Sequence, residues 1–138
     1  MSIEDRWQQR FQNFEKAYNS LIVSVDALEN EPENKFIQDS LIQRYEYSIE
    51  LAWKTLKDFL EYEGYLEIES PKKVIRLGLK EGYLKDELWM QALIDRNKTS
   101  HAYDEEMAKE VIADIQEKYL YLLRDLIDVL KKELTSNE

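Results

Sequence analysis

The chain has 138 residues, a formal net charge of -10 and no cysteine. Without cysteine it can form neither a disulfide nor a thiolate metal site, and its negative charge repels nucleic-acid backbones at long range. A broad, salt-driven nucleic-acid binder is therefore disfavoured, and any contact with a nucleotide or RNA is expected to be local.

Glycine and proline are scarce, with three and two residues, and 35% of the chain is charged. This composition favours long helices joined by few turns. No uninterrupted apolar run reaches the length of a signal peptide or a membrane span, which together with the absence of cysteine predicts a cytoplasmic protein without membrane association. We expect one helical domain over residues 1–134, followed by a polar tail, residues 135–138, that frays.

Apolar side chains between residues 7 and 28 recur at alternating steps of four and three, which places them on one stripe of a long helix. This helix is expected to end near Pro32, because proline disfavours helical backbone in the residue before it. A second stripe predicts another long helix that runs to Gly64, and the two should form an antiparallel hairpin. The first stripe comprises Trp7, Phe11, Phe14, Tyr18, Leu21, Val25 and Leu28, and the second Ile37, Leu41, Tyr45, Ser48, Ala52, Thr55 and Phe59.

The middle of the chain predicts two shorter helices. Ser70 followed by Pro71 is a favourable helix start, because the hydroxyl can accept an early backbone N–H while proline needs no partner there. That helix should stop at Gly82, and the next should begin at Asp86. Asp104 is expected to cap the last helix. The stripe of this last helix comprises Ala108, Val111, Ile115, Tyr119, Leu122, Leu126 and Val129.

No stretch alternates with period two for long enough to predict a strand, and no repeat recurs at a fixed period. The sequence therefore predicts an all-α protein, an up-down bundle of three long and two short helices. With three tryptophans and nine tyrosines, the chain has more large amphipathic rings than a monomeric bundle core requires. We expect it to form a homodimer.

The common motifs of catalysis and cofactor binding are missing from the sequence. It contains no glycine-rich phosphate loop, no His-Glu-x-x-His, no zinc-ligand spacing and no calcium loop, so no cofactor and no metal site are predicted. The 29 acidic residues are spread over what look like solvent-facing positions. They are interpreted as a solvated acidic surface.

Two patterns have both a binding and a structural interpretation. The aromatic residues near the middle of the second helix could form a stacking platform with a cation, but aromatic residues at helical spacing more often belong to the core or an interface. The basic cluster at the start of the third helix could bind an anion, or simply balance the acidic surface. The first group is Tyr45, Tyr47, Trp53 and Lys54, and the second is Lys72, Lys73 and Arg76.

The stretch from residue 96 to residue 103 concentrates chemically capable side chains between two amphipathic segments. It contains Arg96, Asn97, Lys98, Thr99, Ser100, the only histidine, His101, and Tyr103. On a straight helix Arg96 and His101 diverge by about 140°, so they converge only if the helix bends or ends, or if two copies face each other. The alternative is a polar helix end, in which Ser100 and Asp104 cap, His101 contacts backbone and Arg96 pairs with a carboxylate.

The spacing Arg96-x4-His101-x-Tyr103 resembles the R-x4-H-x-Y signature of the HEPN superfamily of small helical proteins. The residues around it resemble one branch, the nucleotidyltransferase substrate-binding proteins, which accompany a minimal nucleotidyltransferase. The resemblance extends over nearly the whole chain. It includes residues 45–57, Ser70-Pro71-Lys72, Trp89 and residues 96–105.

This resemblance implies a helical bundle that dimerises with its two motifs facing each other, and a separate nucleotidyltransferase subunit as partner. Related HEPN proteins are metal-independent ribonuclease toxins, which the partner neutralises, in some cases by adenylylating the motif tyrosine. By that analogy His101 is the acid or base and Arg96 stabilises charge on the phosphate. Asn97 orients the site with Ser100 and Lys98 beside it, and Tyr103 is the candidate modification acceptor.

Three functional hypotheses follow. The chain is a module that supplies substrate or nucleotide recognition to a nucleotidyltransferase, as part of a two-component, toxin-antitoxin-like system, or it is a dimeric ribonuclease restrained by that partner. The acidic charge favours the first, and the intact Arg96, His101 and Tyr103 favour the second. Toxin motifs commonly carry apolar residues before the histidine, where this chain has Thr99 and Ser100. This difference counts against the ribonuclease hypothesis but not against the predicted fold. An interaction bundle without nucleotide chemistry is the third.

Overall fold

The computed structural model describes residues 2–100 and 102–136, and all regular elements in this part of the chain are helical. They are α1 (Ile3–Asn30), α2 (Lys35–Tyr62), α3 (Pro71–Glu81), α4 (Leu88–Thr99), α5 (Glu105–Asp114), the π-helical turn η1 (Ile115–Tyr119) and α6 (Leu120–Ser136). Since α5, η1 and α6 follow one another without a break, the bundle has three long and two short helical rods. The predicted fold class is confirmed.

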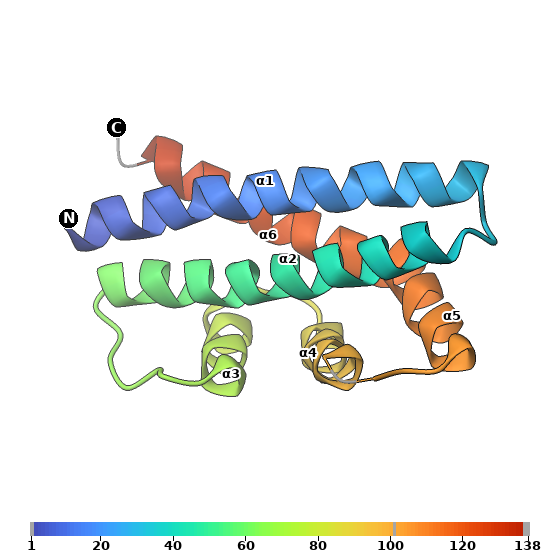
Figure 1. Cartoon of the computed structure of the whole chain (residues 1–138). Coiled ribbons are helices and arrows are strands. Elements are labelled where there is room, and N and C mark those ends of the chain that lie inside the picture. The colour runs from blue at the N-terminus through green and yellow to red at the C-terminus, as the bar shows by residue number, and fades with distance from the viewer. Residues whose placement is uncertain (1, 101, 137–138) are drawn as a thin grey trace.

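Figure 1 shows α1 and α2 side by side and antiparallel, as the sequence predicted, with α6 crossing behind them. The short helices α3 and α4 lie on the side of α2 away from α1, and both are seen nearly end-on in this view. The predicted stripe of α1 is buried except for Tyr18, which is half-buried. The Asn34 side chain caps α2 by accepting from the backbone N–H groups of Phe36 and Ile37. α2 lies at the centre of the bundle, because it contacts each of the other α-helices.

The starts and ends of the later helices follow the predicted capping residues, with one difference. Ser70 accepts from the Lys73 backbone N–H, and Gly82 ends α3 in the left-handed conformation with φ 85°. Asp104 accepts from the Met107 backbone N–H and starts α5. The residue before α4 is Glu87, not Asp86, although the Asp86 carboxylate accepts from the first helical N–H at 2.9 Å.

The sequence did not predict the π-helical turn η1 in the middle of the last helix. A π turn holds one more residue than an α turn and rotates everything after it. Leu123, Ile127 and Leu130 are buried, whereas Val129, which the predicted stripe included, is half-buried. α6 also continues to Ser136 and so includes the first two residues of the predicted tail, and residues 137–138 lie outside the described residues.

Over residues 2–100 and 102–136, no helix combines the length and apolar character that crossing a bilayer demands.

Candidate functional site

The predicted site falls on the last turn of α4 and the segment that leads to α5. Arg96, Asn97 and Lys98 belong to the last turn, and Ser100 is the C-terminal capping residue. His101 lies outside the described residues, so its role stays a prediction. The site must therefore be assembled from the groups on either side of it.

Arg96 reaches across to α2. Its Nη2 lies 3.3 Å from Glu50 Oε2, and its Nη1 donates to Asn97 Oδ1 at 3.2 Å. The Nε–H is buried and has no acceptor in the described part of the chain. The interpretation of Arg96 as the partner of a carboxylate is confirmed, and one donor of its guanidinium remains unused.

Two carboxylates of α2, one helical turn apart, have pKa values shifted in opposite directions, although the Arg96 charge lowers both. Burial raises the pKa of Glu46, and the neighbouring Thr99 hydroxyl and Arg96 charge only partly offset it. Burial also acts on Glu50, but hydrogen bonds from Trp53 and Lys54 and the charges of Lys54 and Arg96 outweigh it and lower the pKa. Arg96 is thus held chiefly by the ionised Glu50.

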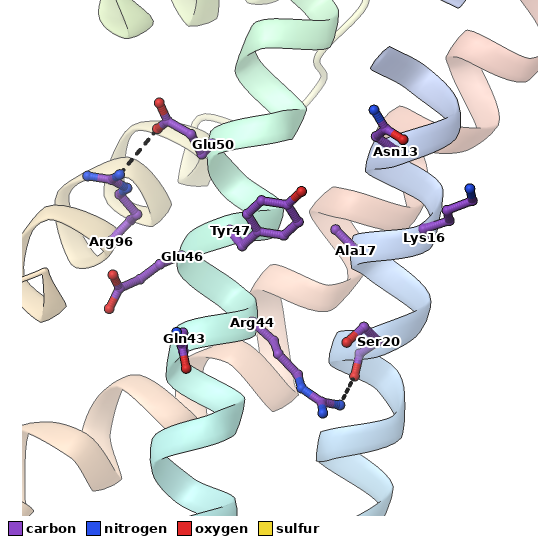
Figure 2. Close-up of a pocket in the computed structure, with 10 residues that line it drawn as sticks. All are labelled: Asn13, Lys16, Ala17, Ser20, Gln43, Arg44, Glu46, Tyr47, Glu50 and Arg96. Atoms are coloured by element: carbon purple, nitrogen blue, oxygen red, sulfur yellow. Dashed lines mark hydrogen bonds and ion pairs between the residues drawn. The ribbon is translucent and has the colours of Figure 1, made fainter. Parts of the chain in front are cut away.

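Arg96 lines a groove of about 590 Å³ to which α1, α2 and α4 all contribute. Figure 2 shows Tyr47 on the α1 side of α2, and Glu46 and Glu50 on the α4 side with Arg96. The Arg44 guanidinium reaches α1, where Nη1 donates to the Ser20 carbonyl at 2.8 Å. The groove therefore combines cationic, anionic and aromatic groups from three helices.

Apart from Arg96, the described side chains of the motif do not line this groove. Lys98 follows Arg96 by two residues, which is about 200° around the helix, and it lines a separate cavity of about 420 Å³. Its Nζ lies 3.8 Å from Asp95 Oδ1. Asn97 is exposed, and the Ser100 hydroxyl donates to the Asn97 carbonyl at 2.7 Å. A single chain therefore does not gather the described residues of the predicted site around one point.

Tyr103 contacts a different part of α2. Its hydroxyl donates to Asp39 Oδ1 at 3.0 Å, and partial burial, followed by this hydrogen bond and the Asp39 charge, raises its pKa to about 12. The phenol is therefore protonated at neutral pH. Asp39 and Glu50 are separated by about 16 Å of helix rise, so Tyr103 and Arg96 are bound to distant points of α2.

A buried hydrogen-bond network positions α4, and sequence reasoning missed it. The Tyr119 hydroxyl donates to Asp95 Oδ2, and Gln91 Nε2 donates to Oδ1 at 3.0 Å. Burial, with the hydrogen bond to Asp95, raises the pKa of Tyr119. Tyr45, stacked on Tyr119 at 5.6 Å between centroids, donates to the Ala92 carbonyl at 2.7 Å. The sequence does contain one indication of this network. Tyr45 and Tyr119 occupy core positions of amphipathic helices, and a buried tyrosine hydroxyl needs a hydrogen-bond partner.

The aromatic residues of α2 and the basic cluster of α3 each had a binding and a structural interpretation. Tyr45 is fully buried, as the core interpretation requires, whereas Tyr47 is 59% exposed. Trp53 Nε1 donates to Glu50 Oε2 at 3.1 Å, and Lys54 Nζ lies 6.0 Å from its ring centroid. In the basic cluster at the start of α3, Lys73 pairs with Glu69 at 3.8 Å, which fits the balancing of acidic charge.

The described acidic side chains form no metal-binding cluster. No group of three or more histidine, cysteine, aspartate and glutamate side chains within residues 2–100 and 102–136 is placed to hold an ion.

Comparisons with known proteins agree with this fold. A family model described as nucleotidyltransferase substrate binding protein like matches residues 9–132. Among solved structures, a crystal structure of a Thermus thermophilus protein is similar, with a TM-score of 0.74 and 33% sequence identity. The match covers 83% of this chain and 96% of that chain. No match was found among curated proteins.

Proposed function

The chain belongs to the nucleotidyltransferase substrate-binding protein-like family, and from this premise we propose that it is the recognition subunit of a two-component minimal nucleotidyltransferase system. In this role it binds a separate nucleotidyltransferase subunit and presents a substrate or nucleotide to it. The observation that carries the proposal is the family match, which spans residues 9–132 and therefore includes α2, α4 and the motif.

The geometry of the motif supports a binding role. Arg96 is engaged by Glu50 and Tyr103 by Asp39, and each of these carboxylates would have to be displaced or joined by any ligand. With the described motif side chains divided between the groove and a separate cavity, one chain alone supplies recognition groups more readily than a complete catalytic centre. The catalytic centre would belong to the partner.

Co-purification tests this proposal. A tagged copy of the chain should retain a coexpressed minimal nucleotidyltransferase subunit through affinity purification and gel filtration, and the two should elute as one stoichiometric species. As a matched control, a chain of similar charge from an unrelated helical bundle should retain none of it. Separate elution of the two subunits at micromolar concentration would falsify the proposal.

The second candidate is a metal-independent ribonuclease that the partner restrains, in the manner of a toxin and its antitoxin. The observation that favours it is the position of Arg96 in an open groove, where a phosphate can approach its guanidinium. In this hypothesis the motifs of two copies face each other in a homodimer, as the family resemblance implies, and His101 of one copy acts beside Arg96 of the other. Tyr103 is then the acceptor that the partner adenylylates: the Tyr103 oxygen attacks the α-phosphorus of ATP, pyrophosphate leaves, and Asp39 accepts the phenol proton.

The ribonuclease hypothesis has its own test. Purified homodimer should cleave RNA in the presence of a chelator, and Arg96→Ala or His101→Ala should abolish cleavage while circular dichroism stays unchanged. Asn97→Ala should slow cleavage, and Tyr103→Phe should keep it but prevent labelling by the partner with radioactive ATP. Equal cleavage by the wild type and both the Arg96 and His101 variants indicates a contaminating nuclease.

A further inference from the structure

We propose that the groove between α1, α2 and α4 is a binding site for a nucleoside phosphate, with Tyr47 stacking on the base and Arg44, together with Lys16, holding the phosphates. This inference rests on the proposed recognition role and assigns to it a site and a class of ligand. The site lies apart from the cavity of Lys98 and from the Tyr103–Asp39 contact.

The size of the groove and its one exposed ring fit such a ligand. A volume of about 590 Å³ falls within the range of small-molecule sites. Tyr47 is 59% exposed, and in the described part of the chain no hydrogen bond or ring contact engages it. Every nucleobase offers a flat face that can stack on such a ring. Tyr47 is therefore available to a base, whereas Tyr45, two residues earlier, is fully buried.

Two cations that line the groove, Arg44 and Lys16, form no ion pair among the described residues. Arg44 spends one N–H on the Ser20 carbonyl. In a chain with 29 acidic residues, a partly buried arginine without a carboxylate retains donors for another anion. The planar guanidinium donates two parallel N–H bonds to phosphate, and the lysine ammonium adds charge. Figure 2 shows Arg44 and Tyr47 on the same side of α2, facing α1.

Glu50 competes with the ligand at the α4 end of the groove. It holds Arg96 at 3.3 Å, and a phosphate that displaces it would gain a third cation. The ionised Glu50 therefore limits affinity for anions. A mononucleotide fits this balance better than a nucleic-acid strand, because the net charge of -10 repels a longer polyanion.

Titration calorimetry on the full chain, with ATP, AMP, adenosine and a short single-stranded RNA as probes, tests the inference. ATP and AMP should bind, and adenosine should bind more weakly. Tyr47→Ala should weaken ATP binding about tenfold, the effect of losing one stacked base, while Tyr47→Phe keeps most of the affinity. Arg44→Ala should weaken ATP and AMP binding but leave adenosine unchanged.

Two further variants sharpen the result. Glu50→Gln should tighten ATP binding by about threefold through release of Arg96, without affecting adenosine. Tyr121→Ala is the matched control: this ring on α6 is 51% exposed and has the Arg124 guanidinium carbon 5.1 Å from its centroid, yet it does not line the groove, so ATP binding should be unchanged.

The inference is overturned if ATP does not bind at millimolar concentration, if Tyr47→Ala binds ATP as well as the wild type, or if the RNA binds more tightly than ATP. These outcomes are independent of the co-purification. A chain that joins the nucleotidyltransferase subunit but binds no ATP loses only this site. A chain that binds ATP in the groove but no partner keeps the site and loses the proposed function.

Discussion

The two halves of α2 hold the rest of the molecule by different kinds of contact. In the C-terminal half, Phe59 packs its ring against Trp7 at 5.0 Å and against Tyr83 at 5.1 Å between centroids. In the N-terminal half and just past the middle, Asp39, Tyr45 and Glu50 form hydrogen bonds or ion pairs with the segment that carries the motif. The aromatic end of α2 contributes more to the stability of the bundle. The polar end positions the motif through contacts whose loss destabilises the fold less.

This difference predicts that the largest loss of stability comes from the aromatic end. Phe59→Ala removes a side chain with no exposed surface and should lower the free energy of unfolding by about 3–5 kcal/mol. Denaturant titration measures the loss. Phe36→Ala is the control on the same helix, where a ring that is 87% exposed should change stability by less than about 0.5 kcal/mol. Equal losses in the two variants contradict the contrast.

A smaller loss is expected at the buried network that connects the polar end to the last helix. Tyr119→Phe leaves the second oxygen of the buried Asp95 without its donor and should cost about 2 kcal/mol. The exposed neighbour offers a control, because Tyr121→Phe removes a hydroxyl from a ring that is 51% exposed. A Tyr119 variant as stable as the Tyr121 variant would show that the hydrogen bond to Asp95 contributes nothing.

The Tyr103–Asp39 contact should appear in the pH dependence of stability. Because the folded pKa is about 12 and the ordinary value is 10.0, the protonated phenol stabilises the fold below pH 10, and this contribution is lost as the pH rises towards 12. Tyr103→Phe should therefore reduce the decline of stability between pH 10 and pH 12, measured by thermal unfolding in matched buffers. Tyr119 also has a raised pKa and should keep part of the decline in that variant.

Asp39→Asn separates the charge from the packing of Tyr103. It removes the anionic acceptor and should shift the pKa of Tyr103 towards its ordinary value, which NMR of ring-labelled tyrosine can follow. An unchanged pKa would assign the shift to burial alone.

The smallest effect on stability is expected at Arg96. Its ion pair with Glu50 is partly exposed, with 27% and 30% of the two side chains accessible, so the coupling in a double-mutant cycle should be below about 1 kcal/mol. In the ribonuclease hypothesis, Arg96→Ala should change RNA cleavage much more than stability. A coupling as large as the loss in Phe59→Ala would make Arg96 a structural residue instead.

The sequence predicted the residues that contact the core better than the partners of the polar residues. The stripes of α1 and α2, the caps at Ser70 and Asp104 and the turn at Gly82 depend on local periodicity and on residue types that act over a few positions. The turn η1 was missed, because a π turn inserts one residue into a stripe that still reads as helical. The prediction that Arg96 pairs with a carboxylate was confirmed, but the sequence did not show that the partner would be Glu50.

By itself, the sequence determined an all-α bundle of three long and two short helices and the segment where its unusual chemistry lies, because burial of amphipathic stripes follows from helical periodicity. Only the tertiary structure decided how that segment is divided. The rotation of α4 against α2 directs Arg96 into the groove with Tyr47 and Arg44 and Lys98 into another cavity, while Tyr103 meets Asp39. Contacts between residues more than forty positions apart depend on how the helices pack, which no local pattern encodes.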